Sequence, residues 1–205
     1  GDAISIVSFY REIAGRLSLE LLQSIEHDLF WLYRHRGRSR GEFQDSPSIV
    51  DLHDQLAQEI IAFRDQINAD RRFVIYKTLV GFESVFPPMW DGEMNIEQKD
   101  DYRKKRISEH VDEITAENAA EWFDIIIRCA QTRSNDGATF PSFMNFLEEL
   151  AREKPDLVLK LIKNIDADLA RFLPFLLRGL EIGGRLDDIA SLANAWLDEK
   201  KYLQQ

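Results

Sequence analysis

Cysteine is nearly absent from this chain, which has a single one among its 205 residues. That residue, Cys129, cannot form a disulfide within the chain, so a fold held together by internal disulfides is excluded. It lies in the mostly apolar run of residues 125–130. A free thiol in such a run packs as a small apolar side chain. We therefore predict that Cys129 is a buried core residue.

Long hydrophobic runs are absent as well. No stretch approaches the roughly 18 consecutive apolar residues that a membrane-spanning helix needs. The first residues also lack the basic start and the apolar core of a signal peptide. We expect a cytoplasmic protein that has no membrane partner.

Positive charge is in deficit, because 26 Lys and Arg residues face 36 Asp and Glu residues and the net charge is -10. This balance favours solubility and opposes tight, generic binding to nucleic acid or to an anionic membrane. A protein partner is therefore the favoured prediction. A nucleic-acid partner is the alternative.

The sequence motifs of common reaction centres are missing too. The chain has no phosphate-binding loop and no metal-ligand pair at helical spacing, and sequence alone cannot assemble a catalytic triad. Three histidines stand beside acidic residues, but none has the spacing of a metal ligand: His27, His53 and His110. We expect no cofactor, no metal and no catalysis. A helical enzyme with acids in an interhelical pocket is an alternative for which the sequence names no residue.

The first part of the chain has strong helical periodicity. Apolar stripes in residues 6–17 and 22–32 predict two helices, the second starting after Ser18 as its cap. Residues 34–41 are highly charged and contain two glycines and no apolar residue, which predicts an exposed loop. A third helix begins at the Ser46-Pro47 start signal. Its apolar stripe is the longest in the chain: Ile49, Leu52, Leu56, Ile60, Phe63 and Ile67.

The middle of the chain is more ambiguous. Residues 73–82 have the aromatic and β-branched content of a strand but lie among helical neighbours, so we interpret them as a helix with a strand as the alternative. Residues 86–92 contain two consecutive prolines and are predicted to form a loop that breaks any helix. Residues 95–114 predict a charged, solvent-facing helix with a thin apolar face. Its basic cluster at 103–106 follows Asp100 and Asp101, and i, i+4 pairing with these acids would neutralise part of the charge.

The second part, from residue 119 to residue 203, contains five short amphipathic helix patterns separated by turn signals. Thr115 is predicted to cap the first of them, and Thr139 the second, which has Pro141 in its first turn. Glycines in a later turn fit the end of a helix: Gly179, Gly183 and Gly184. Three tryptophans fall within helical apolar patterns and are assigned to packing: Trp31, Trp122 and Trp196.

Residues 173–180, Leu-Pro-Phe-Leu-Leu-Arg-Gly-Leu, precede a helix pattern at about 186–202, and this stretch resembles one HEAT repeat. In that family a proline within the first helix kinks it, and Pro174 matches this role by position. The resemblance extends more loosely over residues 115–203. It implies stacked antiparallel helical hairpins, as in an armadillo-like α-solenoid. An irregular helical bundle is the alternative, and both are all α.

The organisation we predict has three parts. Residues 1–86 form an N-terminal helical subdomain, residues 87–114 a loop and a charged connecting helix, and residues 115–205 a HEAT-like hairpin array packed as one unit. The chain starts at Gly1 without methionine, and its last apolar pattern runs toward Gln205 without a glycine cap or a proline stop. We therefore expect a segment of a larger intracellular protein.

Three sets of residues are candidates for partner binding. The first is a set of four alternating arginines: Arg34, Arg36, Arg38 and Arg40. Their guanidinium groups could bind phosphates. We favour instead a solvent-exposed connecting loop, or a loop that contacts an acidic partner. The second is Met89 with Trp90, which either forms an exposed anchor or, as we favour, fills the core. The third lies on the exposed face of the last helix: Asp188, Asn194 and Asp198.

Together these features predict a non-catalytic scaffold that presents a surface between stacked hairpins to a protein partner. The alternative of nucleic-acid binding relies on the segment Arg34 to Arg40. The sequence leaves the oligomeric state open.

Overall fold

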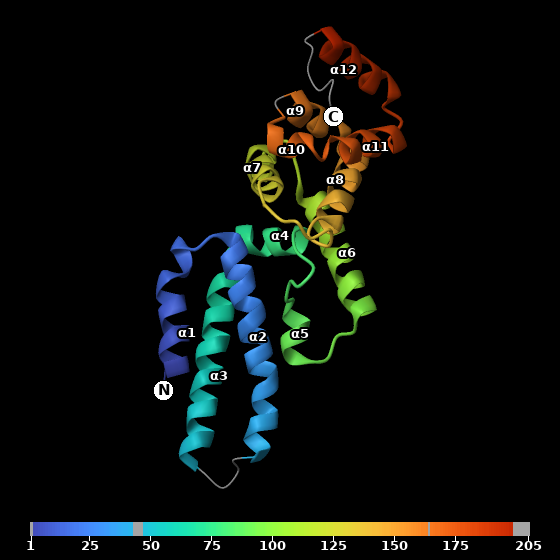
Figure 1. The fold of residues 1–205 in the computed structure, drawn as a ribbon. Coiled ribbons are helices and arrows are strands. Elements are labelled where there is room, and N and C mark those ends of the chain that lie inside the picture. Colours follow the sequence, from blue (N-terminus) through green and yellow to red (C-terminus); the bar gives the residue numbers. More distant parts are fainter. Residues whose placement is uncertain (1, 43–46, 164, 199–205) are drawn as a thin grey trace. The chain divides into compact units, whose positions relative to one another are not determined.

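The computed structural model describes residues 2–42, 47–163 and 165–198, which form twelve α-helices and one 3-10 turn and contain no strand (Figure 1). The all-α prediction is confirmed. Contacts divide the chain into two units. The first contains the residues up to Lys77 together with Phe82–Lys99, and the second contains Thr78–Gly81 together with the residues from Asp100 onward. In the described part of the chain, no helix is both long enough and apolar enough to cross a bilayer.

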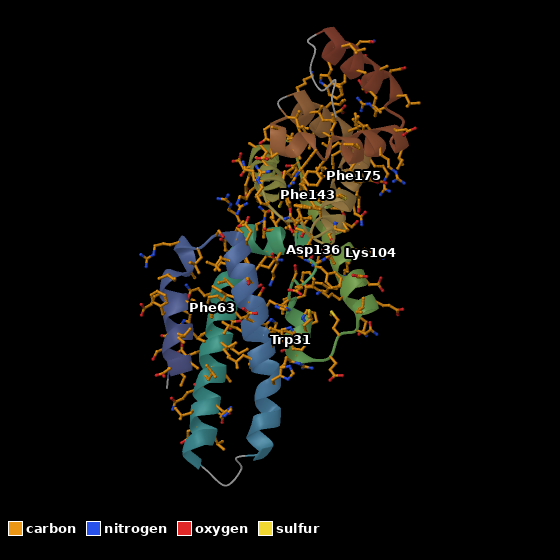
Figure 2. The ribbon with its side chains drawn as sticks, in the orientation of Figure 1. Trp31, Phe63, Lys104, Asp136, Phe143 and Phe175 are labelled. Carbon is orange, nitrogen blue, oxygen red and sulfur yellow. The ribbon has the colours of Figure 1, made fainter. Side chains whose placement is uncertain are left out.

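The first unit is built on three long helices, which Figure 1 shows side by side. Helix α1 spans Asp2–Ile13 and ends in the 3-10 turn Ala14–Arg16. Helices α2 and α3 span Leu19–Glu42 and Pro47–Asn68, and both α1 and α2 pack on α3. Phe63 of α3 is 1% exposed within the core of this unit (Figure 2). The predicted cap Ser18 is confirmed, since its Oγ accepts a hydrogen bond from the Leu21 amide at 3.3 Å.

The predicted loop at residues 34–41 is wrong, because α2 continues through it to Glu42. Each glycine in a helix costs only about 1 kcal/mol relative to alanine, and arginine is a good helix former. The segment contains no proline that would stop the helix. Charge density alone therefore did not distinguish an exposed helix from an exposed loop.

Two short helices complete the first unit. Helix α4 spans Arg71–Leu79, which confirms the helical interpretation for residues 73–79, whereas residues 80–82 lie beyond its end and Gly81 has a φ of 89°. Helix α5 spans Pro87–Asp91, where a loop was predicted. Both prolines lie in its first turn, where the missing amide hydrogens have no helical partner anyway. Trp90 of α5 is buried in the core of the unit.

The second unit begins within α6, which spans Ile96–Glu113 and turns Ile107 and Val111 inward as its apolar pattern predicts. Helices α7, α8 and α9 span Ala119–Ala130, Pro141–Glu153 and Pro155–Lys163. Helices α10, α11 and α12 span Ala167–Ala170, Leu173–Ile182 and Leu186–Asp198. The most extensive helix pair is α8 with α11, and Phe143 of α8 is fully buried (Figure 2). Cys129 is also fully buried, as predicted.

Two predicted caps of this unit are wrong. Asn118, not Thr115, immediately precedes α7, and its Oδ1 accepts a hydrogen bond from the Thr115 amide at 2.8 Å. Phe140 precedes α8, while Thr139 pairs its hydroxyl with that of Ser134 at 2.7 Å. In both turns a short polar side chain makes its hydrogen bond within the turn, instead of accepting one from an amide at the start of the helix.

Pro174 is the second residue of α11, so it starts a helix where a kink within a longer one was expected. A proline is tolerated there because the first amides of a helix have no intrahelical acceptor. Gly183 follows the end of this helix and Gly184 has a φ of 76°, as predicted for a helix end. Gly179 lies inside α11 instead. The resemblance of residues 115–203 to HEAT repeats stays a prediction.

Candidate functional site

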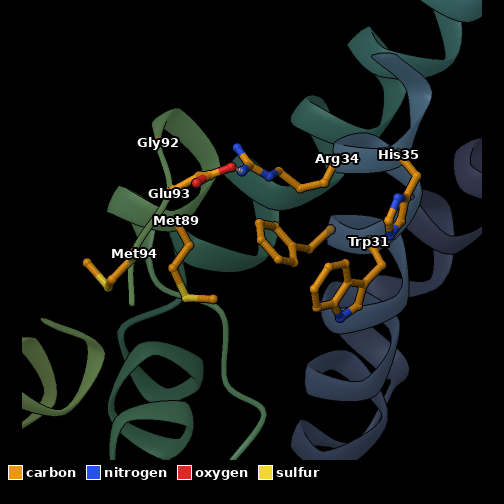
Figure 3. Close-up of a pocket in the computed structure, with 8 residues that line it drawn as sticks. Trp31, Arg34, His35, Met89, Gly92, Glu93 and Met94 are labelled. Atoms are coloured by element: carbon orange, nitrogen blue, oxygen red, sulfur yellow. Dashed lines mark ion pairs between the residues drawn. The ribbon is translucent and has the colours of Figure 1, made fainter. Parts of the chain in front are cut away.

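A groove of about 520 Å³ lies between α2 and the segment formed by α5 and the residues after it (Figure 3). We call it the Trp31 groove. Its lining comes from both segments: Phe30, Trp31, Arg34, His35, Met89, Gly92, Glu93 and Met94. Two of the predicted partner-binding residues, Arg34 and Met89, therefore line one cavity although they are far apart in the sequence.

The α2 wall of the groove presents Trp31, Arg34 and His35 at i, i+3 and i+4, which places them on one helix face. The side chain of Trp31 is 48% exposed, so its assignment to packing is wrong. Its indole N–H donates to His27 Nε2 at 2.9 Å, and its ring stacks on that of His35 at 5.5 Å with 19° between the planes. These contacts hold a large exposed aromatic ring in one orientation.

Arg34 reaches toward Glu93 on the opposite wall, and Figure 3 draws this ion pair. The distance from Arg34 Nη2 to Glu93 Oε1 is 3.6 Å, and the Glu93 side chain is 95% exposed. Such an exposed pair contributes at most about 1 kcal/mol. Both charges are therefore available to a partner that enters the groove.

The floor of the groove is fixed by aromatic packing. Trp90 is 5% exposed and contacts the ring of Phe30 at 5.2 Å in an edge-on arrangement. The Arg64 guanidinium lies 5.3 Å from the centre of the Trp90 ring, within the range of a cation–π contact. The prediction that Trp90 fills the core is confirmed. Met89 is half-buried and adds a polarisable thioether to the wall.

The other predicted partner-binding residues do not join this groove. The side chains of Arg36, Arg38 and Arg40 lie outside the described residues, as does that of Asp198. Asp188 and Asn194 belong to the second unit. Asn194 is exposed on α12, whereas the Asp188 carboxylate accepts a hydrogen bond from Arg185 Nε at 2.5 Å.

A buried ion pair in the first unit was not predicted. Lys77 Nζ donates to both carboxylate oxygens of Glu26 at 2.8 Å and to the Val85 carbonyl at 2.7 Å. Asn68 Nδ2 also donates to Glu26 at 2.8 Å. Burial lowers the pKa of Lys77 from its ordinary 10.5, and the charge of Glu26 opposes this shift. Because the pair connects α2, α3 and α4 and is almost fully enclosed, we assign it to the stability of the fold.

The basic cluster at residues 103–106 is also occupied by internal contacts. Arg103 is 7% exposed and donates to the Gly81 carbonyl at 2.7 Å and to Ser142 Oγ at 3.2 Å. Burial lowers its pKa to about 10, although Asp100 opposes the shift. Arg106 pairs with Glu109, and Lys105 lies 3.9 Å from the same carboxylate. The acids predicted for this pairing were Asp100 and Asp101, whereas the ion pairs of Lys105 and Arg106 are with the following Glu109.

In the residues that the structure describes, no group of three or more His, Cys, Asp or Glu side chains is placed to hold a metal ion. Comparison of the chain with models of protein families, with curated proteins and with solved structures gave no match.

Sequence reasoning missed Trp31, His35, Glu93 and Met94 as members of the groove. The signal for the first two was present, because Trp31, Arg34 and His35 have helical spacing once residues 34–41 are taken as part of α2. Glu93 and Met94 had no such local signal, since their place in the groove depends on how α5 packs against α2.

Proposed function

We propose that this chain is a non-catalytic helical interaction module, part of a larger intracellular protein, and that it binds a protein partner in the Trp31 groove. The observation that carries the proposal is Trp31 itself, half exposed and held by His27 and His35 at the wall of an open groove. Tryptophan is enriched among the residues that dominate binding energy at protein interfaces. A side chain that is already ordered loses little entropy when a partner binds.

The rest of the groove supports a protein ligand. Met89 and Met94 offer flexible apolar contact area, which suits varied side chains. Arg34 and Glu93 offer one charge of each sign at the rim, so a partner carrying both charges can pair with each. A mixed apolar and polar lining of this kind is common where one protein binds another.

Nucleic acid is the alternative ligand of the same groove, since a base could stack on Trp31 while Arg34 contacts a phosphate. Two features oppose it. Glu93 places a negative charge 3.6 Å from Arg34, and the chain carries a net charge of -10. The experiment that tests the proposal therefore includes nuclease.

Replacing Trp31 with alanine is expected to abolish partner capture while lowering the free energy of unfolding by no more than about 1 kcal/mol, because the side chain is half exposed. The measurement is capture from a lysate of the native cells at about 150 mM salt, where charges beyond roughly 8 Å are screened. A nuclease-treated sample is run in parallel, and the retained proteins are identified by mass spectrometry.

Phe9→Ala is the matched control for Trp31→Ala, since Phe9 is an aromatic residue 54% exposed on α1 of the same unit and does not line the groove. A protein retained by the unmodified chain and by Phe9→Ala, but not by Trp31→Ala, supports the proposal. Equal retention by all three would remove the groove as the binding site. Loss of retention after nuclease treatment would favour nucleic acid instead.

A further inference from the structure

The residue that orients Trp31 is a histidine, the type of side chain whose charge ordinarily changes between about pH 5 and 8. Trp31 Nε1 donates to His27 Nε2 at 2.9 Å, across one turn of α2. An indole N–H group can only donate, so Nε2 must offer a free electron pair, and the ring is neutral with its proton on Nδ1. A protonated imidazole carries a proton on both nitrogens. The hydrogen bond that holds Trp31 therefore exists only in the neutral form of His27.

Two carboxylates are placed to receive the ring of His27 once it is protonated. Its Nδ1 lies 3.8 Å from Asp28 Oδ1 and 3.8 Å from Glu83 Oε2. Asp28 follows His27 on α2, whereas Glu83 lies between α4 and α5. The two acidic side chains are 80% and 73% exposed, so both have room to approach a charged ring. His27 thus has two sets of partners: Trp31 when it is neutral, and the two carboxylates when it is protonated.

Two cations also lie in this region, and each has an acceptor of its own. Lys99 of α6 donates to the carbonyl of Phe82, the residue before Glu83, at 2.8 Å. Arg34 of α2 pairs with Glu93 across the groove. The two carboxylates beside His27 therefore remain placed to pair with a protonated ring.

A second histidine, His35, lies against Trp31, and Figure 3 shows the two rings next to each other. Protonation of His35 would strengthen this stacked contact, because a cation is attracted to the face of an aromatic ring. Protonation of His27 has the opposite effect, since it removes the acceptor of the indole N–H. A loss of order of Trp31 in acid is therefore assigned to His27, and an experiment must separate the two histidines.

We infer that His27 is a proton-operated switch of the Trp31 groove. The neutral ring holds Trp31 in its present orientation. Protonation leaves two N–H groups facing each other, and the ring then pairs with Asp28 and Glu83, because hydrogen bonds between charged groups are the stronger ones. A partner that needs the fixed indole would bind about two- to tenfold more weakly in acid, which is the value of one neutral hydrogen bond. This consequence rests on the proposed function, whereas the switch is a property of the free chain.

The test follows the indole N–H resonance of Trp31 by NMR in the free, nitrogen-15-labelled chain, between about pH 8 and pH 5. A spectrum of Trp31→Phe identifies this resonance among those of the four tryptophans. The proton resonance is expected to move upfield as the pH falls, because the hydrogen bond to His27 is lost. In His27→Gln the amide oxygen can still accept from the indole but does not titrate, so most of this movement is expected to disappear.

Two further variants serve as controls. His35→Phe keeps a stacked ring that cannot be protonated, and the movement of the Trp31 resonance is expected to remain. His53→Gln removes another histidine of the first unit, one that does not line the groove, and is expected to behave like the unmodified chain. Circular dichroism checks that each variant keeps its helix content.

A Trp31 resonance that does not move between about pH 8 and pH 5 would overturn the inference. So would a movement that persists in His27→Gln and disappears in His35→Phe, since His35 would then be its source. The proposed function fails separately, when Trp31→Ala captures the same proteins as the unmodified chain. That result would leave the switch in the free chain unchanged and remove only its effect on a partner.

Discussion

Replacing Lys77 with methionine is expected to lower the free energy of unfolding of the first unit by about 3–5 kcal/mol, because it leaves the Glu26 carboxylate buried without its counter-ion. Glu26 and Lys77 are each 1% exposed. The methionine fills the space of the lysine stem but cannot donate to Glu26 or to the Val85 carbonyl, which Lys77 Nζ contacts at 2.7 Å. The measurement is urea denaturation, with hydrogen exchange of the α2 to α4 amides to localise the effect to the first unit.

Two further variants separate the ion pair from mere packing. In the double variant Glu26→Gln with Lys77→Met, no buried charge remains, and Asn68 can still donate to the glutamine oxygen. We therefore expect this variant to be more stable than Lys77→Met alone. Arg11→Met removes a half-exposed ion pair with Glu59 of the same unit, at 2.7 Å, and is expected to cost at most about 1 kcal/mol. A Lys77→Met variant no less stable than Arg11→Met would show that burial does not make this pair important.

The elements that could be predicted from the sequence are those with a long apolar stripe or a proline start signal. Helix α3 begins at Pro47 and α8 begins at Pro141, as the prolines indicated. Trp122 and Ile126 of α7 are fully buried, in agreement with their spacing. In these helices the spacing of apolar residues along the local sequence already shows which face is buried. The helices could therefore be predicted without knowing their neighbours.

The sequence predictions failed where two local states have similar free energies. Residues 34–41 lack an apolar stripe, and their high charge density and two glycines were taken to favour a loop over the end of α2. The prolines at 87 and 88 start α5 instead of forming a loop, because their effect depends on their place in the helix. Asn118 and Thr115 are both suitable residues to precede α7. Which of them takes that position depends on the geometry of the turn, which the sequence does not show.

The candidate site was predictable only in part. Arg34 and Met89 were named as separate candidates, but their meeting in one groove depends on the packing of α5 against α2. Lys77 had a weaker signal, since it is the one charged residue in the mostly apolar run of residues 73–80, and a buried charge requires a partner. Glu26 had no such signal, because it stands beside His27 and Asp28. The sequence alone did not pair Lys77 with Glu26, because the two residues are far apart along the chain.

Replacing Gly179 with alanine is expected to destabilise the second unit by about 2–3 kcal/mol through overpacking of α11 against α8. A Cβ added to Gly179 would lie 2.2 Å from the Glu148 carbonyl oxygen and 2.6 Å from the Ala151 Cβ. The nearest atom belongs to the backbone of α8, so a change of side-chain rotamer cannot relieve the clash, and the two helices must move apart. This cost exceeds the gain of about 1 kcal/mol that alanine usually brings to a helix interior. Urea denaturation, with hydrogen exchange of the α8 and α11 amides to localise the change to the second unit, measures the effect.

Gly137→Ala is the matched control in the same unit, because a Cβ at Gly137 meets no atom within 4 Å and its stability change should stay within about 0.5 kcal/mol. Combining Gly179→Ala with Ala151→Gly tests which contact matters. The combination removes the methyl at 2.6 Å but keeps the carbonyl at 2.2 Å, so it is expected to recover little stability. Full recovery would mean that the Ala151 side chain, rather than the backbone of α8, sets the distance between the two helices. A Gly179→Ala variant as stable as Gly137→Ala would show that α8 and α11 are free to adjust to the added methyl group.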